Sequence, residues 1–321
     1  MAGSRNKPFT DPISAAVAAC LSRHCRAGQS VVVGYSGGLD STVLLHAAKR
    51  ISVESGLGLS ALHIHHGLSP NADAWAVRCG EVCRAIDVPL AVTRVVVPER
   101  SGEGIEAAAR RVRHKALEEH PADGILLGHH ADDQAETILH NLLRGTGVRG
   151  AAAMPESRGR LLRPLLSVGR KVIEEYGHFH QLGWIEDESN SDTRYTRNFL
   201  RLEILPVIAS RFPGAGEQLA SAALRFGEAS ELLDELALVD LQGNSSGFPQ
   251  RLALFRGLSD ARARNLLRAM LTWQQVQPPD ERRLSEFVRQ LRTAGADRHP
   301  RIDLTGYSVW CEAGEVRFRK G

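Results

Sequence analysis

Short apolar runs alternate with longer stretches of helical periodicity along the first half of the chain. Such runs, bounded by glycine and polar residues, are typical of buried strands, whereas apolar residues three and four apart indicate helices. We expect strands at 31–35, 59–64, 90–97 and 124–127 and helices at 40–50, 71–86, 103–119 and 131–143. Strands that alternate with helices form a parallel sheet with right-handed crossovers. The predicted fold is therefore α/β, with a doubly wound parallel sheet.

Polar sequences follow three of these four predicted strands. They are Ser36-Gly37-Gly38, His65-His66-Gly67 and Gly128-His129-His130. Ligands of open parallel sheets bind beyond the carboxyl ends of the strands. We therefore expect the functional site along this edge of the sheet.

The second half of the chain has a different pattern. Residues 160–206 mix helical and turn signals and complete the first domain, and Phe212-Pro213-Gly214 then breaks the helical pattern. Beyond this break we expect a long helix at 217–241, a loop at 243–247, an arginine-rich pair of helices and a short β meander at 302–318. The predicted domains are residues 1–212 and a smaller, mostly helical second domain at 213–321.

The composition is that of a folded, soluble protein, with 43% hydrophobic and 24% charged residues in 321. This length favours two domains. The apolar runs fall short of the roughly 18 residues that a membrane span requires. Residues 1–11 are polar and lack the apolar core of a signal peptide. We expect a cytoplasmic protein that does not enter a membrane.

Five cysteines, at positions 20, 25, 79, 83 and 311, follow no disulfide framework. We expect free thiols, as in a reducing compartment. A zinc or iron–sulfur site at Cys79 and Cys83 is the weaker alternative, because two further ligands at metal-like spacing are missing.

Two segments are strongly basic although the formal net charge is only +3. Residues 141–171 hold seven basic residues and one acid, and residues 251–301 hold eleven arginines and five acids. Such segments suit a phosphate backbone, and solvated helix faces are the alternative. The arginines on the two predicted helices are Arg262, Arg264, Arg268, Arg282, Arg283, Arg289 and Arg292.

The strongest motif is Ser36-Gly37-Gly38-Leu39-Asp40-Ser41, placed between a predicted strand and a predicted helix. Two glycines let the backbone approach a phosphate, and the helix start directs N–H groups at the anion. The motif lacks the Gly-Lys-Ser/Thr end of a Walker loop and is no dinucleotide fingerprint. It resembles the PP-loop of the ATP pyrophosphatases, which split ATP into AMP and pyrophosphate.

Later blocks resemble one PP-loop family, the tRNA(Ile)-lysidine synthetases. The blocks are 63–68, 104–113, the run Gly128-His129-His130-Ala131-Asp132-Asp133-Gln134-Ala135-Glu136-Thr137, 143–147, 163–166, 184–190 and 196–198. They cover residues 31–206, and the second domain carries a weaker resemblance. The resemblance implies an adenine nucleotide α-hydrolase-like fold for the first domain and a tRNA-binding role for the second. Many family members are longer, so this chain is either a short variety or part of a longer protein.

The resemblance implies a nucleotide site with ATP and Mg²⁺ as cofactors. Asp40 would hold the magnesium ion at the pyrophosphate end, because a carboxylate that faces phosphates needs a cation between them. We expect the backbone near Ile64 to frame the adenine, and His63, His65 and His66 to be hydrogen-bonded, half-buried imidazoles. The residues expected to bind the nucleotide are Ser36, Gly37, Gly38, Leu39, Asp40, Ser41, Ile64 and His129.

The resemblance also implies a site for lysine and tRNA. Asp132, Asp133 and Glu136 open one helix, and capping explains one carboxylate but not three. We expect Asp133 and Glu136 to hold the lysine ammonium; His129 and His130 as zinc ligands are the weaker alternative. Arginines 110, 113, 144 and 197 would serve the substrates, and the expected catalytic residues are Asp40, Arg113 and Asp133.

The implied reaction converts the wobble cytidine of tRNA(Ile) with a CAU anticodon to lysidine, which changes codon and amino-acid specificity from methionine to isoleucine. ATP adenylates the base, and lysine then displaces AMP at carbon 2. The partners are that tRNA, L-lysine and ATP, and the resemblance admits a homodimer. A tRNA thiolase is the alternative within the superfamily, but it needs a catalytic cysteine beside the loop. A non-catalytic nucleotide-binding regulator is the alternative outside it.

Overall fold

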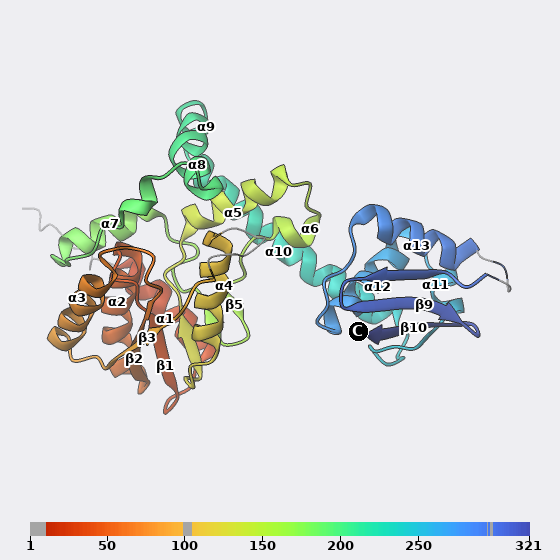
Figure 1. Cartoon of the computed structure of the whole chain (residues 1–321), viewed down its shortest axis with the longest axis horizontal. Helices are drawn as coiled ribbons and strands as arrows, with labels where there is room; N and C mark the ends of the chain where they lie inside the picture. Colours follow the sequence, from red (N-terminus) through yellow and green to blue (C-terminus); the bar gives the residue numbers. More distant parts are fainter. Residues whose placement is uncertain (1–10, 99–104, 294, 296–297) are drawn as a thin grey trace, which may run out of the picture. The chain divides into compact units, whose positions relative to one another are not determined.

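A computed structural model describes residues 11–98, 105–293, 295 and 298–321 (Figure 1). The chain divides into two compact units, residues 1–227 and 228–321. Their border falls inside helix α10 (Ala215–Asp240). The break at Pro213-Gly214, where the sequence suggests a domain boundary, lies directly before this helix.

The first unit is built on a six-stranded sheet in the order β3-β2-β1-β4-β6-β5. Its strands are β1 (Ser30–Gly34), β2 (Gly58–His65), β3 (Leu90–Arg94), β4 (Gly124–Leu126), β5 (Ser157–Arg158) and β6 (Leu161–Leu162). The central strand β1 is parallel to both β2 and β4, and the edge strand β5 is antiparallel to β6. The predicted parallel α/β sheet is confirmed.

Helices connect the strands as the alternating pattern predicts. Those of the first unit are α1 (Pro12–His24), α2 (Leu39–Ser55), α3 (Ala72–Ala85), α4 (Ile105–Glu118), α5 (Ala131–Leu143), α6 (Val148–Ala151), α7 (Arg170–Phe179), α8 (Thr196–Phe199) and α9 (Leu205–Arg211), with a 3₁₀ turn at Glu188–Ser191 and a π-helical turn, η2, at Leu200–Ile204. The predicted start of α4, at Glu103 and Gly104, lies outside the described residues.

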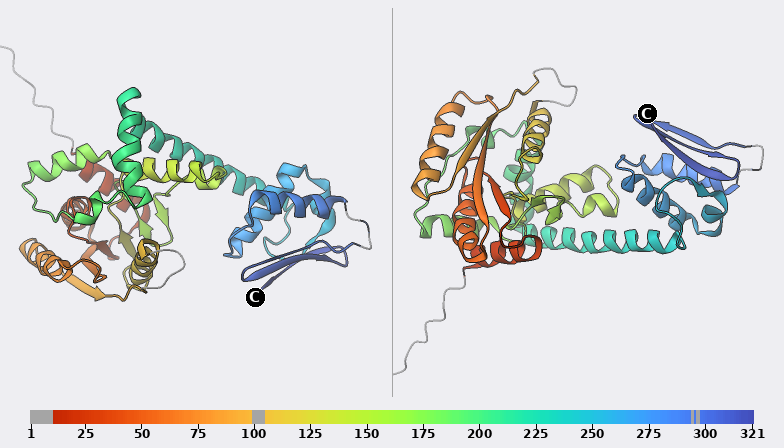
Figure 2. Two further views of the ribbon diagram at one scale, coloured as in Figure 1. Left: turned by 45° about the horizontal axis from the view of Figure 1, so that its top comes forward. Right: turned by 90° about the horizontal axis from the view of Figure 1, so that it is seen from below.

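The strands bury alternate residues in two cores, as a pleated strand dictates. Val31 and Val33 of β1 pack in the core beneath α1, α2 and α3, whereas Val32 packs in the core that Leu117 of α4 covers. Figure 2 shows the sheet between these helices. Burial of each such valine contributes about 1.5–3 kcal/mol relative to exposure. The two covered faces leave the ends of the strands as the place for ligands.

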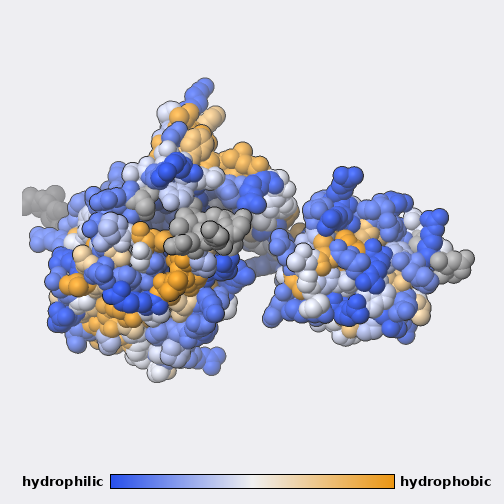
Figure 3. All heavy atoms as spheres, in the orientation of Figure 1, coloured by the Kyte–Doolittle hydropathy of each residue, from blue (hydrophilic) through white to orange (hydrophobic). Residues whose placement is uncertain are grey.

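The second unit packs helices against an antiparallel sheet, which confirms the predicted helices and β meander. Its elements after α10 are β7 (Gln250–Arg251), α11 (Leu252–Gly257), α12 (Asp260–Trp273), α13 (Glu281–Thr293), β8 (Arg301–Leu304), β9 (Tyr307–Glu312) and β10 (Glu315–Lys320). Leu266, Phe287 and Val309 meet in its core. Hydrophilic residues cover most of its face in Figure 3. No helix in the described part of the chain is long and apolar enough to cross a bilayer.

Candidate active site

The loop of residues 36–41 joins β1 to α2 and is held by contacts on both sides. Gly37 has a φ of +86°, and a Cβ there would lie 2.6 Å from Cδ1 of Ile185, so glycine is required. The N–H of Ile185 donates to the Gly37 carbonyl at 2.9 Å. The end of β4 approaches from the other side, where a Cβ on Gly128 would lie 3.0 Å from the Asp40 carbonyl carbon. The loop therefore has one tightly defined path.

The start of α2 is suited to an anion. Its N-cap is Gly38, which has no side chain to satisfy the first N–H groups of the helix. The hydroxyl groups of Ser36 and Ser41 lie 3.1 Å apart beside these groups. Leu39 is buried in the core, so only its backbone serves the loop. Free N–H groups with the helix dipole behind them form a ready phosphate site.

Beside this helix start lies a cluster of acids around His130, the residue before α5. The His130 side chain is 1% exposed; its Nε2 lies 3.7 Å from Asp40 Oδ1 and 3.5 Å from Asp133 Oδ2. Neither ring nitrogen has a hydrogen-bond partner among the described residues, and the same is true of Asp40 Oδ1. Burial raises the pKa of Asp40 above its ordinary value. A buried carboxylate oxygen without a partner fits a hard cation such as Mg²⁺.

Asp132 and Asp133 each accept a hydrogen bond from a backbone N–H group. Asp132 Oδ2 accepts the backbone N–H of Arg170 at 2.8 Å and so caps helix α7. Asp133 Oδ2 accepts the backbone N–H of His130 at 3.0 Å. Burial would raise the pKa of Asp133, but His130, His129, this N–H and Arg201 lower it overall. Asp133 is therefore charged at neutral pH.

Arg201, which the sequence analysis missed, pairs with two of the predicted lysine-binding acids. Its Nη2 lies 3.0 Å from Asp133 Oδ1, and its Nε lies 2.5 Å from Glu136 Oε1. The Glu136 side chain is 1% exposed, whereas that of Asp133 is 13% exposed. A signal was available, because Arg201 follows Arg197 of the recognised block by four residues, one helical turn.

A cavity of about 500 Å³ opens over α4 and contains several of the predicted substrate residues. Its wall includes Arg110, Arg113, His129, Tyr195 and Asn198. A smaller cavity, lined by Ser36 and Ile64 among others, shares His66, Arg113, Leu117 and Asp187 with it. The two cavities therefore adjoin, and they connect the phosphate loop to the arginines of α4.

The large cavity carries charges of both signs, with Arg110 and Arg113 as its cations and Asp187 and Glu188 as its acids. Burial, followed by the neighbouring Arg197, lowers the pKa of Arg110 to about 10, so its guanidinium remains charged at neutral pH. Burial lowers the pKa of His129 to about 3, and its Nδ1 accepts from Arg163 Nε at 3.3 Å. His129 is thus neutral, and the arginines supply the charge for an anionic substrate.

The two remaining arginines predicted to bind substrate, Arg197 and Arg144, lie in different places. Arg197 donates to Thr137 of α5 at 3.2 Å and lies near Arg110. Arg144 is exposed at the far end of α5, eleven residues past Asp133, which at 1.5 Å per residue is about 16 Å away. The structure therefore brings Arg197 to the site and leaves Arg144 outside it.

Two arginines of the basic segment 141–171 form hydrogen bonds within the first unit. Arg160 donates to the carbonyls of His120 and Ala122, where it caps the end of α4, and Arg163 holds His129. The exposed residues Arg144, Arg158 and Lys171 remain available to a partner.

The histidines of β2 have hydrogen-bond partners, as expected. His63 Nδ1 lies 3.0 Å from the Tyr35 carbonyl oxygen, and His65 Nε2 lies 3.1 Å from Asp73 Oδ1. His66 lines both cavities. His63 and His65 therefore support the strand end.

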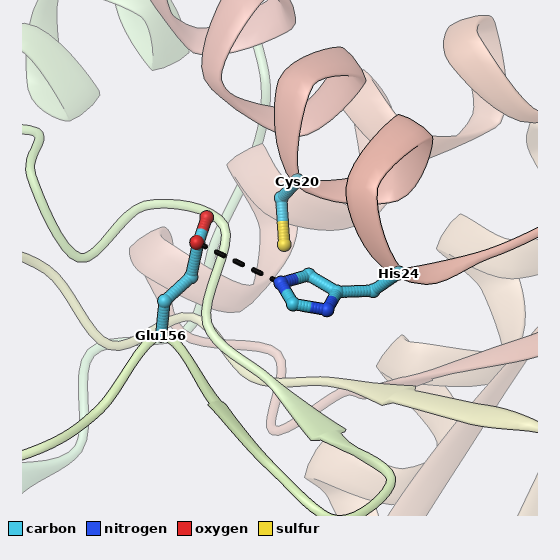
Figure 4. A group of neighbouring side chains, drawn as sticks. All are labelled: Cys20, His24 and Glu156. Atoms are coloured by element: carbon cyan, nitrogen blue, oxygen red, sulfur yellow. Dashed lines mark ion pairs between the residues drawn. The ribbon is translucent and has the colours of Figure 1, made fainter. Parts of the chain in front are cut away.

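The five cysteines are free thiols. Burial raises the pKa of Cys79 to about 12 and that of Cys83 to about 11, so neither provides the reactive thiolate of a thiolase. In the described part of the chain, Cys20, His24 and Glu156 are the group whose ligand atoms come close enough for a metal ion (Figure 4). Arg23 already forms an ion pair with Glu156, so this group ties α1 to the segment before β5 without a metal.

Comparisons with known families match both units. The PP-loop domain matches residues 10–208, and the TilS substrate binding domain matches residues 251–317.

Curated relatives match along most of the chain. The tRNA(Ile)-lysidine synthase of Alkalilimnicola ehrlichii is 47% identical over 89% of this chain and 64% of its own length. The enzymes of the same name from Azoarcus sp. and Pseudomonas aeruginosa are 44% and 46% identical, over 97% and 90% of this chain and 68% and 67% of theirs. This chain thus spans about two thirds of the length of these relatives.

Among solved structures, the U34-tRNA thiolase NcsA of Methanococcus maripaludis matches with a TM-score of 0.59 at 16% identity. The match covers 68% of this chain and 80% of the thiolase chain. At this identity the likeness shows a shared fold.

Proposed function

Because the chain belongs to the PP-loop family of tRNA(Ile)-lysidine synthases, we propose that it ligates lysine to carbon 2 of the wobble cytidine of tRNA(Ile) with a CAU anticodon. The observation that carries the proposal is the pair of adjoining cavities between the phosphate loop and the arginines of α4. The proposed reaction needs one cavity for ATP and another that admits the cytidine and the lysine amine. Enzymes that modify a base take it into such a pocket.

The first step is adenylation of the cytosine. Its carbonyl oxygen attacks the α-phosphorus of ATP, the bond to pyrophosphate breaks, and AMP stays attached to carbon 2 through that oxygen. Residues 36–41 would hold the phosphates through backbone N–H groups, and the strand end at Ile64 would border the adenine. Asp40 would hold Mg²⁺, which supplies charge neutralisation for the pyrophosphate. Arg110 and Arg113 would hold the backbone phosphates of the tRNA beside the cavity.

The second step joins the amine. The neutral ε-amine of lysine attacks carbon 2, its proton passes to a carboxylate, and AMP leaves with the former carbonyl oxygen. We place the ammonium of the incoming lysine at Asp133, since Glu136 is buried and bonded to Arg201. The two carboxylates share one guanidinium, so one negative charge remains to attract the ammonium. Most of the catalysis comes from positioning, because adenylation has already created the leaving group.

Incorporation of labelled lysine tests this function, with isoleucine and methionine tRNAs that carry the same anticodon as substrates. We expect ATP-dependent labelling of the isoleucine tRNA and little labelling of the methionine tRNA. ATP-dependent sulfur incorporation without lysine would establish the thiolase instead, and pyrophosphate release from neither tRNA would favour a regulator. The tRNA partner would place the protein in the cytoplasm; the homodimer stays a prediction.

A further inference from the structure

Helix α7 begins beside the phosphate loop, although the sequence analysis assigned it no role in the site. It packs against α2, and a Cβ on Gly177 of α7 would lie 3.0 Å from Leu39 Cδ1 and 3.6 Å from Val43 Cγ2. Its N-cap, Gly169, offers no side-chain cap. The first residue of α7, Arg170, reaches Asp40 in the first turn of α2. Two helix starts therefore lie next to each other at the loop.

The Arg170 side chain is held in place but not saturated. Its Nη1 lies 3.7 Å from Asp40 Oδ2, and its Nε donates to Glu174 at 3.0 Å. Its backbone N–H donates to Asp132 Oδ2. A guanidinium has five N–H donors, so most of those on Arg170 stay available within the described structure. The group is 39% exposed and can meet a ligand at the loop.

The buried imidazole of His130 indicates independently that a ligand belongs here. Its Nδ1 lies 3.6 Å from Asp132 Oδ2 and its Nε2 lies 3.7 Å from Asp40 Oδ1, the acids that flank Arg170. Within the described structure both nitrogens lack a hydrogen-bond partner, although the side chain is 1% exposed. Buried polar atoms are almost always satisfied by protein, water or a ligand. Unsatisfied atoms at this point favour a polar ligand between α2 and α7.

We infer that Arg170 is a further phosphate-binding residue, whose guanidinium binds the β- and γ-phosphates of ATP and the pyrophosphate that leaves. Arginine matches phosphate oxygens with two parallel hydrogen bonds and keeps its charge. Asp132 then positions Arg170 by fixing its backbone. The inference rests on the proposed ATP-dependent function, because it assigns the ligand as that reaction's pyrophosphate.

Calorimetric titration of the full chain with magnesium pyrophosphate tests this role. We expect Arg170→Ala to weaken pyrophosphate binding roughly 10- to 100-fold, the usual size for hydrogen bonds to a charged group. Arg170→Lys keeps the charge but loses the paired hydrogen bonds. Its pyrophosphate affinity should therefore lie between those of the wild type and Arg170→Ala. Lys171→Ala is the matched control, since Lys171 is the next residue, carries the same charge and is 87% exposed. It should bind as the wild type does.

A purely structural role predicts another result. In that case Arg170→Ala would lower the melting temperature without ligand and leave the pyrophosphate affinity unchanged, which would overturn the inference. A wild-type chain that binds no pyrophosphate would overturn it as well. Lysine incorporation is measured separately. A chain that incorporates no lysine but loses pyrophosphate binding on Arg170→Ala would refute the proposed function and leave this site standing.

Discussion

The two units differ in how the chain neutralises its own charged residues. In the second unit, six of the seven arginines that stand out in the sequence of α12 and α13 pair with acids of the same unit. The pairs are Arg262–Asp240, Arg264–Glu281, Arg268–Glu281, Arg283–Asp280, Arg289–Glu286 and Arg292–Asp260. Arg282 forms no ion pair in the described part of the unit.

The site of the first unit has ion pairs too, from Arg170 to Asp40 and from Arg201 to two acids, but it also holds polar groups without partners. Asp40 Oδ1 and both nitrogens of His130 lack hydrogen-bond partners, and Arg110 and Arg113 form no ion pair with an acid among the described residues. Buried polar atoms without a partner, such as those of Asp40 and His130, are costly, so a fold keeps them where a ligand completes them. The exposed side chains of Arg110 and Arg113 can meet an anion. We therefore expect unpaired charge to mark a phosphate-binding surface better than a count of arginines does.

The largest effect should come from Asp40→Asn, which removes the carboxylate charge at the loop. We expect lysine incorporation to be abolished, because the variant cannot hold the magnesium ion. Burial raises the pKa of Asp40 above its ordinary 3.8, so the ionised carboxylate costs stability once the pH exceeds about 3.8. The Asp40→Asn variant should therefore melt at a higher temperature than the wild type at pH 7, and the difference should vanish as the pH falls below about 4.

The control for Asp40→Asn is Asp87→Asn, a change at a fully exposed carboxylate. It should leave both activity and melting temperature unchanged. Turnover near the wild-type rate in Asp40→Asn would show that the Asp40 carboxylate is not the magnesium ligand.

The next largest effect should distinguish the roles of Asp133 and Glu136, the two acids that pair with Arg201. Asp133→Asn should raise the KM for lysine at least about tenfold, the size of a lost charged hydrogen bond, while tRNA-dependent ATP–pyrophosphate exchange persists. Glu136→Gln should leave the KM for lysine nearly unchanged, because the Glu136 side chain is buried against Arg201 and away from the incoming amine. Loss of exchange with an unchanged KM in Asp133→Asn would move that residue to the magnesium site.

A smaller effect is expected for tRNA binding by the second unit. Arg282→Ala should reduce the slope of log Kd against log salt by roughly one unit, the loss of one phosphate contact. Arg289→Ala, on the same helix, should leave the slope unchanged, because Glu286 already neutralises Arg289. Parallel lines for wild type and both variants would make Arg144, Arg158 and Lys171 of the first unit the better candidates for the tRNA surface.

The smallest effect is expected from the exposed ion pair between Arg289 and Glu286, which should contribute slightly to the stability of the fold. A hydrogen bond from Arg289, then one from Gln290, lowers the pKa of Glu286 to about 2. Because the pKa is lowered in the folded state, the ionised Glu286 stabilises the fold at pH values above its ordinary pKa of 4.5. This contribution is lost as the pH falls through about 2. Arg289→Ala should lower the urea midpoint slightly at pH 7 and not at pH 2. An equal loss at both pH values would show that Arg289 acts through packing.

The sequence predicted the sheet and the phosphate loop well, because both follow from local patterns. All four predicted strands and the helices between them are present. Strands β5 and β6 were missed, since two residues each are too few to show a periodicity. The border inside α10 is likewise invisible, because one continuous helix crosses it.

The sequence predicted several residues of the candidate site, but it did not predict which of their side chains bond to one another. Asp133 and Glu136 stood out as acids at a helix start, but their pairing with Arg201 depends on η2, more than sixty residues later. Asp132 stood out as a substrate residue, and its bond to the start of α7 was not foreseen. Long-range pairing of this kind is set by tertiary packing, which the sequence pattern of one helix does not contain.

The bond between Ile185 and Gly37 has a consequence during synthesis of the protein. The ribosome completes the phosphate loop early, but Ile185, which covers Gly37 and fixes its carbonyl, is synthesised only after residues 42–184. A nascent chain that ends before Ile185 therefore lacks the support of the loop. The loop therefore takes its final path only when Ile185 is available to pack against Gly37.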